Sequence, residues 1–276
     1  MMRSDYPEPV AKLLTLGETV FHSERNYLKM GFTRAHIPDL IRLLEDAELR
    51  SLPWGEDGTA PPEVFAQVHA WRTLAQLEAV EAIPALVGLL HWIDEDQDDY
   101  VDEEVPVMLG KLGAAAIQPC HDILADRSKH KYERIAASSA LAEIGKQHPE
   151  TREACVQALV SSLENYQDDD EEINAFTLSD LAELKAVEAA PLAKEIFEAG
   201  CADESIMGDY EDFQVEMGLL EKRLTPARDL FGVQRDLLGQ KFMDTPRATP
   251  KKANQAKKEK ARRKQAEKAR RRNRKR

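Results

Sequence analysis

The chain has 276 residues, of which 42% are hydrophobic and 6% aromatic, with 13 glycines and 14 prolines. This composition excludes collagen-like and glycine/serine-rich chains and supplies enough apolar residues for a folded core. Three cysteines (Cys120, Cys155 and Cys201) are too few for a disulfide-stapled secreted scaffold. The formal net charge of −12 is unevenly distributed. Residues 247–276 hold 16 Lys and Arg and 2 Glu, whereas residues 1–246 hold 22 Lys and Arg and 48 Asp and Glu.

The start of the chain carries Asp5 and Glu8 and has no long apolar stretch, so we expect no secretory signal. No run of about 18 apolar residues occurs, so no membrane span is expected. We therefore expect a soluble, cytoplasmic, monomeric protein with reduced thiols. In a eukaryote the basic segment would serve as a nuclear import signal.

Apolar residues at spacings of three and four predict helices through most of the chain. A capping helix is expected near residues 9–22, and residues 226–242 form either a short closing helix or a loosely docked segment. Between them we predict five helix pairs. The first helices are expected at 34–46, 82–92, 115–125, 151–164 and 187–199, and the second helices at 62–77, 101–112, 131–146, 170–184 and 205–220.

An internal repeat supports the helix pairs. Four similar strings begin at Leu74, Leu109, Leu141 and Leu181, which are 35, 32 and 40 positions apart. In three of the four units a proline stands ten positions after this leucine, where it suits the first turn of the next helix: Pro84, Pro119 and Pro191. A period of about 35–47 residues with two helices per unit is typical of an α-solenoid.

Residues 105–113 (VPVMLGKLG), continuing through Ala116, Ile117 and Pro119, resemble a HEAT-like repeat of the phycobilisome-lyase type. Residues 134–145 resemble the second helix of that repeat, and the resemblance extends over roughly residues 33–219. Together with the helix pairs above, it implies an all-α fold, an α-solenoid of about five HEAT-like helix pairs, and the composition of the C-terminal segment predicts a disordered basic tail. The expected regions are 1–32 (capping), 33–225 (solenoid), 226–246 (closing) and 247–276 (tail). The resemblance says little about activity, because lyases, hydroxylases and scaffolds share such repeats.

Acidic residues cluster between the first and second helices of several units, at turns that a solenoid places along one edge. We therefore predict an acidic ridge and give three interpretations: favourable charge at helix N-termini, docking of a basic partner, or docking of the protein's own tail. A calcium loop is disfavoured because Asp99 and Val105 stand where an EF-hand needs Gly and Glu. A third cluster lies at 203–212, and Arg127, Lys129 and Lys131 make one turn basic. The ridge residues are Asp94, Glu95, Asp96, Asp98, Asp99, Asp102, Glu103, Glu104, Asp168, Asp169, Asp170, Glu171 and Glu172.

The basic tail contains no Leu, Ile, Val, Phe, Trp or Tyr, so it cannot bury a core. Its charge favours salt-dependent contact with RNA or the ribosome without base readout, and the alternative is masking by the acidic ridge. The candidate polyanion-binding residues are Lys251, Lys252, Lys257, Lys258, Lys260, Arg262, Arg263, Lys264, Lys268, Arg270, Arg271, Arg272, Arg274, Lys275 and Arg276.

The sequence contains few residues in patterns that are typical of catalysis or metal binding. No histidine is followed by glutamate, as paired metal ligands of HEAT-repeat hydroxylases would require, and no phosphate loop or nucleophile elbow occurs. We read the pair His121–Asp122 as an exposed helix pair and the cysteines as small core residues. We predict no catalytic residue, no metal and no cofactor. Trp54, Trp71 and Arg72 are candidate partner contacts, although core packing also explains Trp71.

These observations favour a non-enzymatic protein-binding scaffold or adaptor whose tail contacts RNA or the ribosome without sequence specificity. The protein partner cannot be named from the sequence. Two alternatives stay open: a HEAT-repeat enzyme, either lyase-like or a metal-dependent hydroxylase, and a regulator that masks its own tail.

Overall fold

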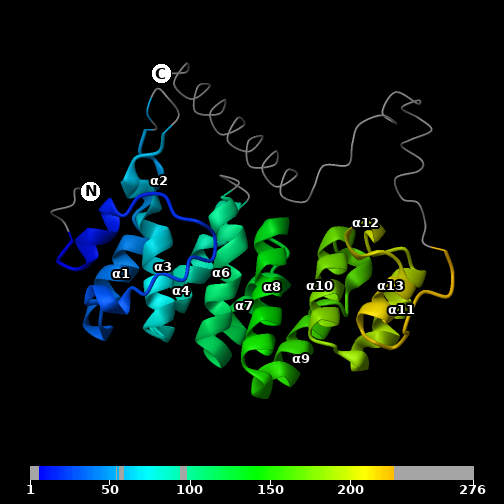
Figure 1. Cartoon of the computed structure of the whole chain (residues 1–276). Helices are drawn as coiled ribbons and strands as arrows, with labels where there is room; N and C mark the ends of the chain where they lie inside the picture. Colours follow the sequence, from blue (N-terminus) through cyan, green and yellow to red (C-terminus); the bar gives the residue numbers. More distant parts are fainter. Residues whose placement is uncertain (1–5, 54, 56–58, 94–97, 227–276) are drawn as a thin grey trace, which may run out of the picture. The chain divides into compact units, whose positions relative to one another are not determined.

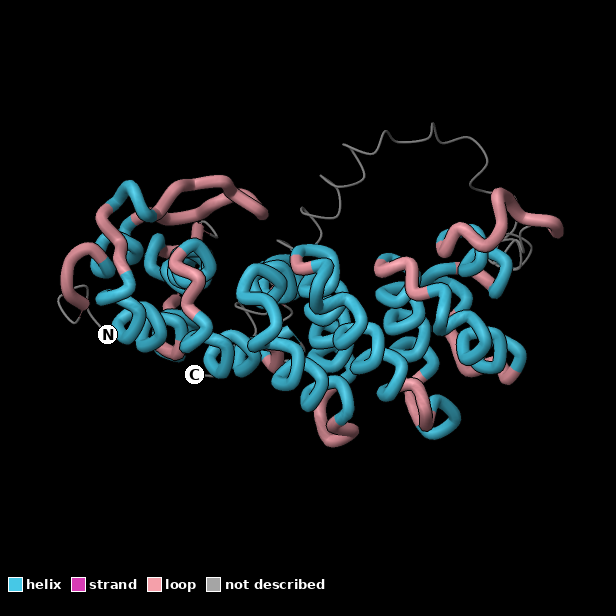
Figure 2. Tube along the Cα trace, turned by 90° about the horizontal axis from the view of Figure 1, so that it is seen from below, coloured by secondary structure: helices cyan, strands magenta, loops and turns pink. Residues whose placement is uncertain are grey.

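The fold is that of a computed structural model, which describes residues 6–53, 55, 59–93 and 98–226. These residues form helices, turns and loops, and no strand occurs among them (Figures 1 and 2). The predicted all-α class is therefore confirmed. The chain divides into two compact units, residues 1–51 with 62–226 and residues 52–61 with 227–276. In the second unit, the Gly55 amide donates a hydrogen bond to the Thr59 carbonyl over 2.8 Å.

Five helices of the first unit begin near the positions predicted for the first helices, and a 3₁₀ turn precedes each one. Pro38, Pro84 and Pro191 stand in the first turns of three of them, where the missing N–H has no helical partner. The helices are α1 (Ile37–Leu44), α4 (Ile83–Leu89), α7 (Ile117–Ala125), α9 (Arg152–Ser162) and α11 (Ala190–Glu198).

Four predicted second helices are also present: α3 (Ala66–Gln76), α6 (Asp99–Leu112), α8 (Lys131–Gln147) and α10 (Glu171–Glu183). The single helix predicted at 205–220 is wrong, because the chain forms α12 (Glu204–Met207) and α13 (Tyr210–Glu216) instead. Gly208 separates them with φ of +91°, a conformation that side-chain-bearing residues rarely adopt. A short helix that the sequence did not predict, α2 (Ala47–Arg50), follows α1.

The capping helix predicted near 9–22 is also wrong. Only a 3₁₀ turn, Val10–Thr15, forms there, and it buries Val10, Leu13 and Leu14. Gly17 then takes φ of +68°, and the residues after it are irregular up to the next 3₁₀ turn, Leu28–Met30. Side chains of α3 and α6 bind the main chain of this segment, as described below. The closing helix predicted at 226–242 lies outside the described residues, apart from Pro226.

Neighbouring pairs pack against one another in chain order. Among the second helices, α3 contacts α6, α6 contacts α8 and α8 contacts α10; among the first helices, α1 contacts α4, α4 contacts α7 and α7 contacts α9 (Figure 1). The leucines that begin the four repeated strings, Leu74, Leu109, Leu141 and Leu181, are completely buried. The repeat that is visible in the sequence therefore marks equivalent core positions.

Two distant loops repeat the same bonding pattern. The Arg34 guanidinium donates to the Leu77 carbonyl over 3.0 Å and to the Glu81 carboxylate over 2.7 Å. In a later unit, Arg152 donates to the Leu184 carbonyl over 2.8 Å and to Glu188 over 3.0 Å. The residues after the two carbonyls, Glu78 and Lys185, have φ of +51° and +52°. Each arginine thus binds the C-terminus of its own unit's second helix and an acid in the following turn.

Three of the four units also share a buried polar residue seven positions before the repeated leucine. These residues are Gln67, Arg134 and Asn174. Gln67 donates to the Leu44 carbonyl, Arg134 to the Leu124 carbonyl and Asn174 to the Tyr166 carbonyl, over 2.8, 2.8 and 2.9 Å. Each bond joins a second helix to the end of the first helix or to the turn after it. A polar side chain at this register therefore satisfies carbonyls that the helix end leaves without a partner.

The close packing of α8 can be tested by a substitution at Gly145, with Gly88 on α4 as the control position. A Cβ at Gly145 would lie 2.8 Å from Leu184 Cδ2, whereas a Cβ at Gly88 has no neighbour within 4 Å. We predict that Gly145→Ala lowers the free energy of unfolding by about 1–3 kcal/mol, since the packed core cannot give way freely. Gly88→Ala should raise it by up to about 1 kcal/mol through helix propensity. Urea unfolding monitored by circular dichroism measures both, and equal effects of the two substitutions would contradict the packing described.

Candidate functional site

Aspartates of the predicted acidic clusters are the N-caps of helices. The Asp98 carboxylate accepts bonds from the amides of Tyr100 and Val101, and Asp170 accepts from the Glu172 amide over 2.9 Å. Asp203 and Asp209 cap α12 and α13 in the same way. Each carboxylate satisfies amides that the first helical turn leaves unbonded and lies where the helix dipole favours negative charge. For these residues the helix-terminus interpretation accounts for the acid.

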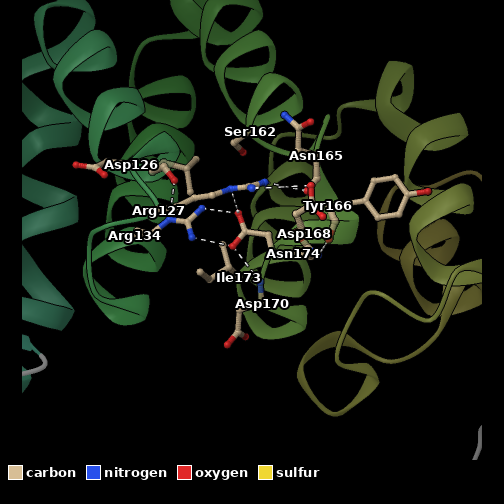
Figure 3. A network of polar contacts seen from close by, with 12 residues as sticks. Asp126, Arg127, Arg134, Ser162, Asn165, Tyr166, Asp168, Asp170, Ile173 and Asn174 are labelled. Carbon is tan, nitrogen blue, oxygen red and sulfur yellow. Dashed lines mark hydrogen bonds and ion pairs between the residues drawn. The ribbon is translucent and has the colours of Figure 1, made fainter.

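Cations of the neighbouring turns pair with many of these acids (Figure 3). Arg134 donates to both oxygens of Asp169, over 2.7 and 2.6 Å, and both side chains are almost buried. Arg127 donates to the Asn165 carbonyl over 3.1 Å, and its Nη1 lies 4.0 Å from the Asp168 carboxylate. The turn that is basic in sequence therefore lies beside the acidic turn of the next unit.

The other clusters have similar partners. Lys131 bonds to Glu172 and lies 3.8 Å from Asp170, Arg50 binds Asp98 over 2.7 Å, and Arg223 pairs with the cluster at 209–212. Sequence reasoning missed Arg50, Arg134 and Arg223, although Arg134 occupies the polar register seven positions before a repeated leucine. Asp99, Asp102, Glu103, Asp168, Asp170 and Glu171 have exposed side chains. Part of the negative charge at the acidic edge is thus paired with cations of the body.

Several predicted site residues lie outside the described residues: Trp54, Asp94, Glu95, Asp96 and the whole basic tail, 247–276. Three others are placed in the interior, which corrects the prediction. Glu104 is 0% exposed and does not belong to an acidic surface, and Trp71 and Arg72 are 1% and 4% exposed. None of these three side chains can contact a partner directly in this conformation.

These three buried side chains are joined by hydrogen bonds and an ion pair. The Arg72 guanidinium donates to both oxygens of the Glu104 carboxylate, one of them over 2.8 Å from Nε, and Trp71 Nε1 donates to Glu104 over 3.1 Å. Burial alone would raise the pKa of Glu104, but the bonds from Arg72, Trp71 and the His22 amide outweigh it and hold the pKa below its usual range. Glu104 is therefore a carboxylate inside a fully hydrogen-bonded network.

The same network binds an irregular stretch of the chain, residues 17–27, which we call the strap; it turns at its centre, where His22 has φ of +53°. We call the side chains that hold it the strap groove. Four carbonyls of the strap accept bonds from the groove, and two of its amides donate to it. The groove consists of His69, Arg72 and Gln76 on α3 and of Tyr100 and Glu104 on α6.

The central bonds of the groove come from the ion pair. Arg72 donates to the Val20 carbonyl over 2.8 Å and to the Thr19 hydroxyl over 2.9 Å, and the His22 amide donates to Glu104 over 2.8 Å. At the far end, Gln76 donates to the Arg25 carbonyl over 2.7 Å and accepts from the Tyr27 amide over 2.9 Å. The groove thus supplies donors for four main-chain carbonyls and acceptors for two main-chain amides.

His69 is completely buried at the start of the strap. Because the Gly17 carbonyl can only accept a hydrogen bond, His69 Nε2 carries the proton and donates to it over 2.9 Å, and Nδ1 accepts from the Tyr27 hydroxyl over 2.7 Å. Burial lowers the pKa of His69 from 6.5 to about 4. The neutral imidazole therefore joins both ends of the strap at physiological pH.

Residues with catalytic potential elsewhere are held in structural contacts. Cys120 and Cys155 are buried, as predicted, and Cys201 is partly exposed; burial raises the pKa of Cys120 to about 12, which disfavours a thiolate. His121 contacts the Ser161 hydroxyl over 2.9 Å. Among the described residues, no group of three or more His, Cys, Asp or Glu is arranged to hold a metal ion.

A buried Ser138–Asp180 pair links α8 to α10, with the serine hydroxyl donating to the carboxyl group. Burial raises the pKa of Asp180 to about 8. No histidine or lysine contacts this pair directly in the described bonds, so it connects two helices and forms no nucleophile–base arrangement.

Comparisons with family models, with curated proteins and with solved structures found no match to this chain. Within the part of the chain that the structure describes, no helix combines the length and apolar character needed to cross a bilayer.

The low pKa of His69 makes stability depend on pH. The pKa of His69 is about 4 in the folded chain and 6.5 in the unfolded chain. Between these two pH values the imidazole is therefore protonated in the unfolded chain and neutral in the folded chain. We predict that this group contributes up to about 3 kcal/mol of stability at neutral pH, which is lost as the pH falls from 6.5 to 4. The variant His69→Gln should show a shallower pH dependence of unfolding free energy in this window, by up to one proton. Identical slopes for the two proteins would contradict this assignment.

Proposed function

We propose that this protein is a non-enzymatic α-solenoid of HEAT-like helix pairs. In this proposal the helical body binds a partner protein, and the basic segment 247–276 contacts RNA or the ribosome through phosphate charge. Support for the solenoid comes from the repeated leucines, the matching arginine contacts of Arg34 and Arg152, and the packing of successive pairs in chain order. Units that bury their faces on their neighbours are the defining property of this class.

The strap is the observation that carries the protein-binding role. A groove on α3 and α6 binds an irregular polypeptide segment mainly through its main chain. A scaffold that recognises partner segments needs a surface of this kind, with donors and acceptors fixed on rigid helices.

Self-masking of the tail is a weaker alternative. Asp169, Asp170 and Glu172 already pair with arginine or lysine of the body, as do Asp98 and Asp209. A basic tail would have to displace these cations to pair with these five acids. An enzymatic role has less support still, because the cysteines and the one buried histidine occupy structural positions.

The RNA-binding role predicts a strong dependence on the tail. In filter binding with a single-stranded RNA homopolymer, the full chain should bind with an affinity that falls steeply as salt increases, because cation contacts release counterions. Deletion of 247–276 should lower the affinity at least about tenfold at low salt. A full-length control, with all Lys and Arg of 247–276 changed to Gln, should behave like the deletion. Equal RNA affinity of the intact and deleted proteins would refute the role of the tail.

A further inference from the structure

We propose that the strap groove is a binding site for peptide segments that turn at their centre as residues 17–27 do, and that the strap is an intramolecular ligand which a partner's segment replaces. The inference extends the proposed protein-binding role by naming the site and the chemistry of the partner. It is independent of the RNA-binding role, which concerns a different part of the chain.

Main-chain groups dominate the recognition of the strap. The groove accepts from or donates to the main chain at Gly17, Thr19, Val20, His22, Arg25 and Tyr27. Two strap side chains also bond to groove side chains: the Thr19 hydroxyl bonds to Arg72 and the Tyr27 hydroxyl to His69. Because every peptide carries the same main-chain groups, such a groove accepts different sequences that keep a free N–H and tolerate positive φ at the central position.

The strap contributes little to the core between its ends. No side chain from Gly17 to Asn26 is buried, and Val20 is 70% exposed; Tyr27 is the first buried residue, at 0% exposed. Phe21 stacks on Tyr100 with ring centroids 4.4 Å apart and is partly exposed. A segment held by hydrogen bonds, with few buried apolar contacts, opens at a lower free energy than the body it lies on.

The strap shields the groove from water. Arg72 and Glu104 are 4% and 0% exposed with the strap in place, and each bonds to the strap in addition to its partner. When the strap leaves, water can solvate both charges, so a partner segment that excludes this water has to supply the same amide and carbonyl groups. The geometry favours a partner segment that turns at its centre, with a Thr or Ser eight residues before a Tyr, as Thr19 stands before Tyr27, and with a residue that tolerates positive φ at the position of His22.

The test uses the full chain and a fluorescent synthetic peptide of residues 16–28, with binding followed by anisotropy. In the protein, His22→Pro removes the amide that donates to Glu104, and it also excludes the φ of +53° that His22 adopts, because proline fixes φ near −65°; the side chain that it replaces is exposed. This change weakens the strap and leaves the groove intact. We expect the His22→Pro protein to bind the peptide at least about tenfold more tightly than the wild type, since a hydrogen bond to a charged group is lost only from the competing strap.

Two controls define the outcome. The protein variant Glu24→Ala changes an exposed strap side chain and should bind the peptide as the wild type does, and a peptide with Pro at the position of His22 should bind none of the proteins. If His22→Pro does not fold, Thr19→Val removes the hydroxyl bonded to Arg72 and should increase peptide binding several-fold. Peptide binding no tighter in the folded strap variant than in the wild type would overturn the proposal, as would equal binding of the proline-containing peptide.

Discussion

The buried ion pair between Arg72 and Glu104 is the interaction on which the N-terminal half of this structure depends. Removing two charges from water costs several kcal/mol for each ion, and mutual attraction offsets this cost only when the remaining donors and acceptors are satisfied. Here they are satisfied by Trp71 and by the main chain of the strap. The ion pair and the strap therefore require each other, which explains why an irregular segment with exposed side chains is held against α3 and why α3 is buried on every side.

A different constraint shapes the edge formed by the turns between paired helices. Each second helix needs acceptors for its first amides, and aspartates such as Asp98 and Asp170 provide them. Arg50, Arg134 and Lys131 pair with Asp98, Asp169 and Glu172 at this edge. Helix capping thus explains why acidic residues cluster at these turns, while residues 1–246 as a whole keep 48 acidic against 22 basic residues. The contrast that capping does not explain is the one between the body and residues 247–276.

The sequence predicted the helices well because their signals are local. Spacings of three and four, prolines in first turns and the repeated leucines located nine of the ten paired helices, and Gly208 explains the break in the tenth. The site was predicted poorly because it depends on long-range contacts. Glu104 lies in an acidic run and was assigned to the surface, but Arg72, 32 residues away, holds it inside. The strap carries no helix or strand period, and only Gly17 after an apolar turn indicated that a helix would not continue through it.

Hydrogen exchange of the double variant Arg72→Met/Glu104→Leu tests the central claim most directly. Apolar replacements of similar size leave no unpaired charge in the interior, so the helices should stay folded. If the ion pair holds the strap, the amides of His22 and Tyr27, which donate to Glu104 and Gln76, will lose their protection in this variant, while amides of α8 and α10 keep the protection seen in the wild type. Unchanged protection of the Tyr27 amide, whose acceptor the variant retains, would contradict the account, because the strap would then be held by something other than Arg72 and Glu104.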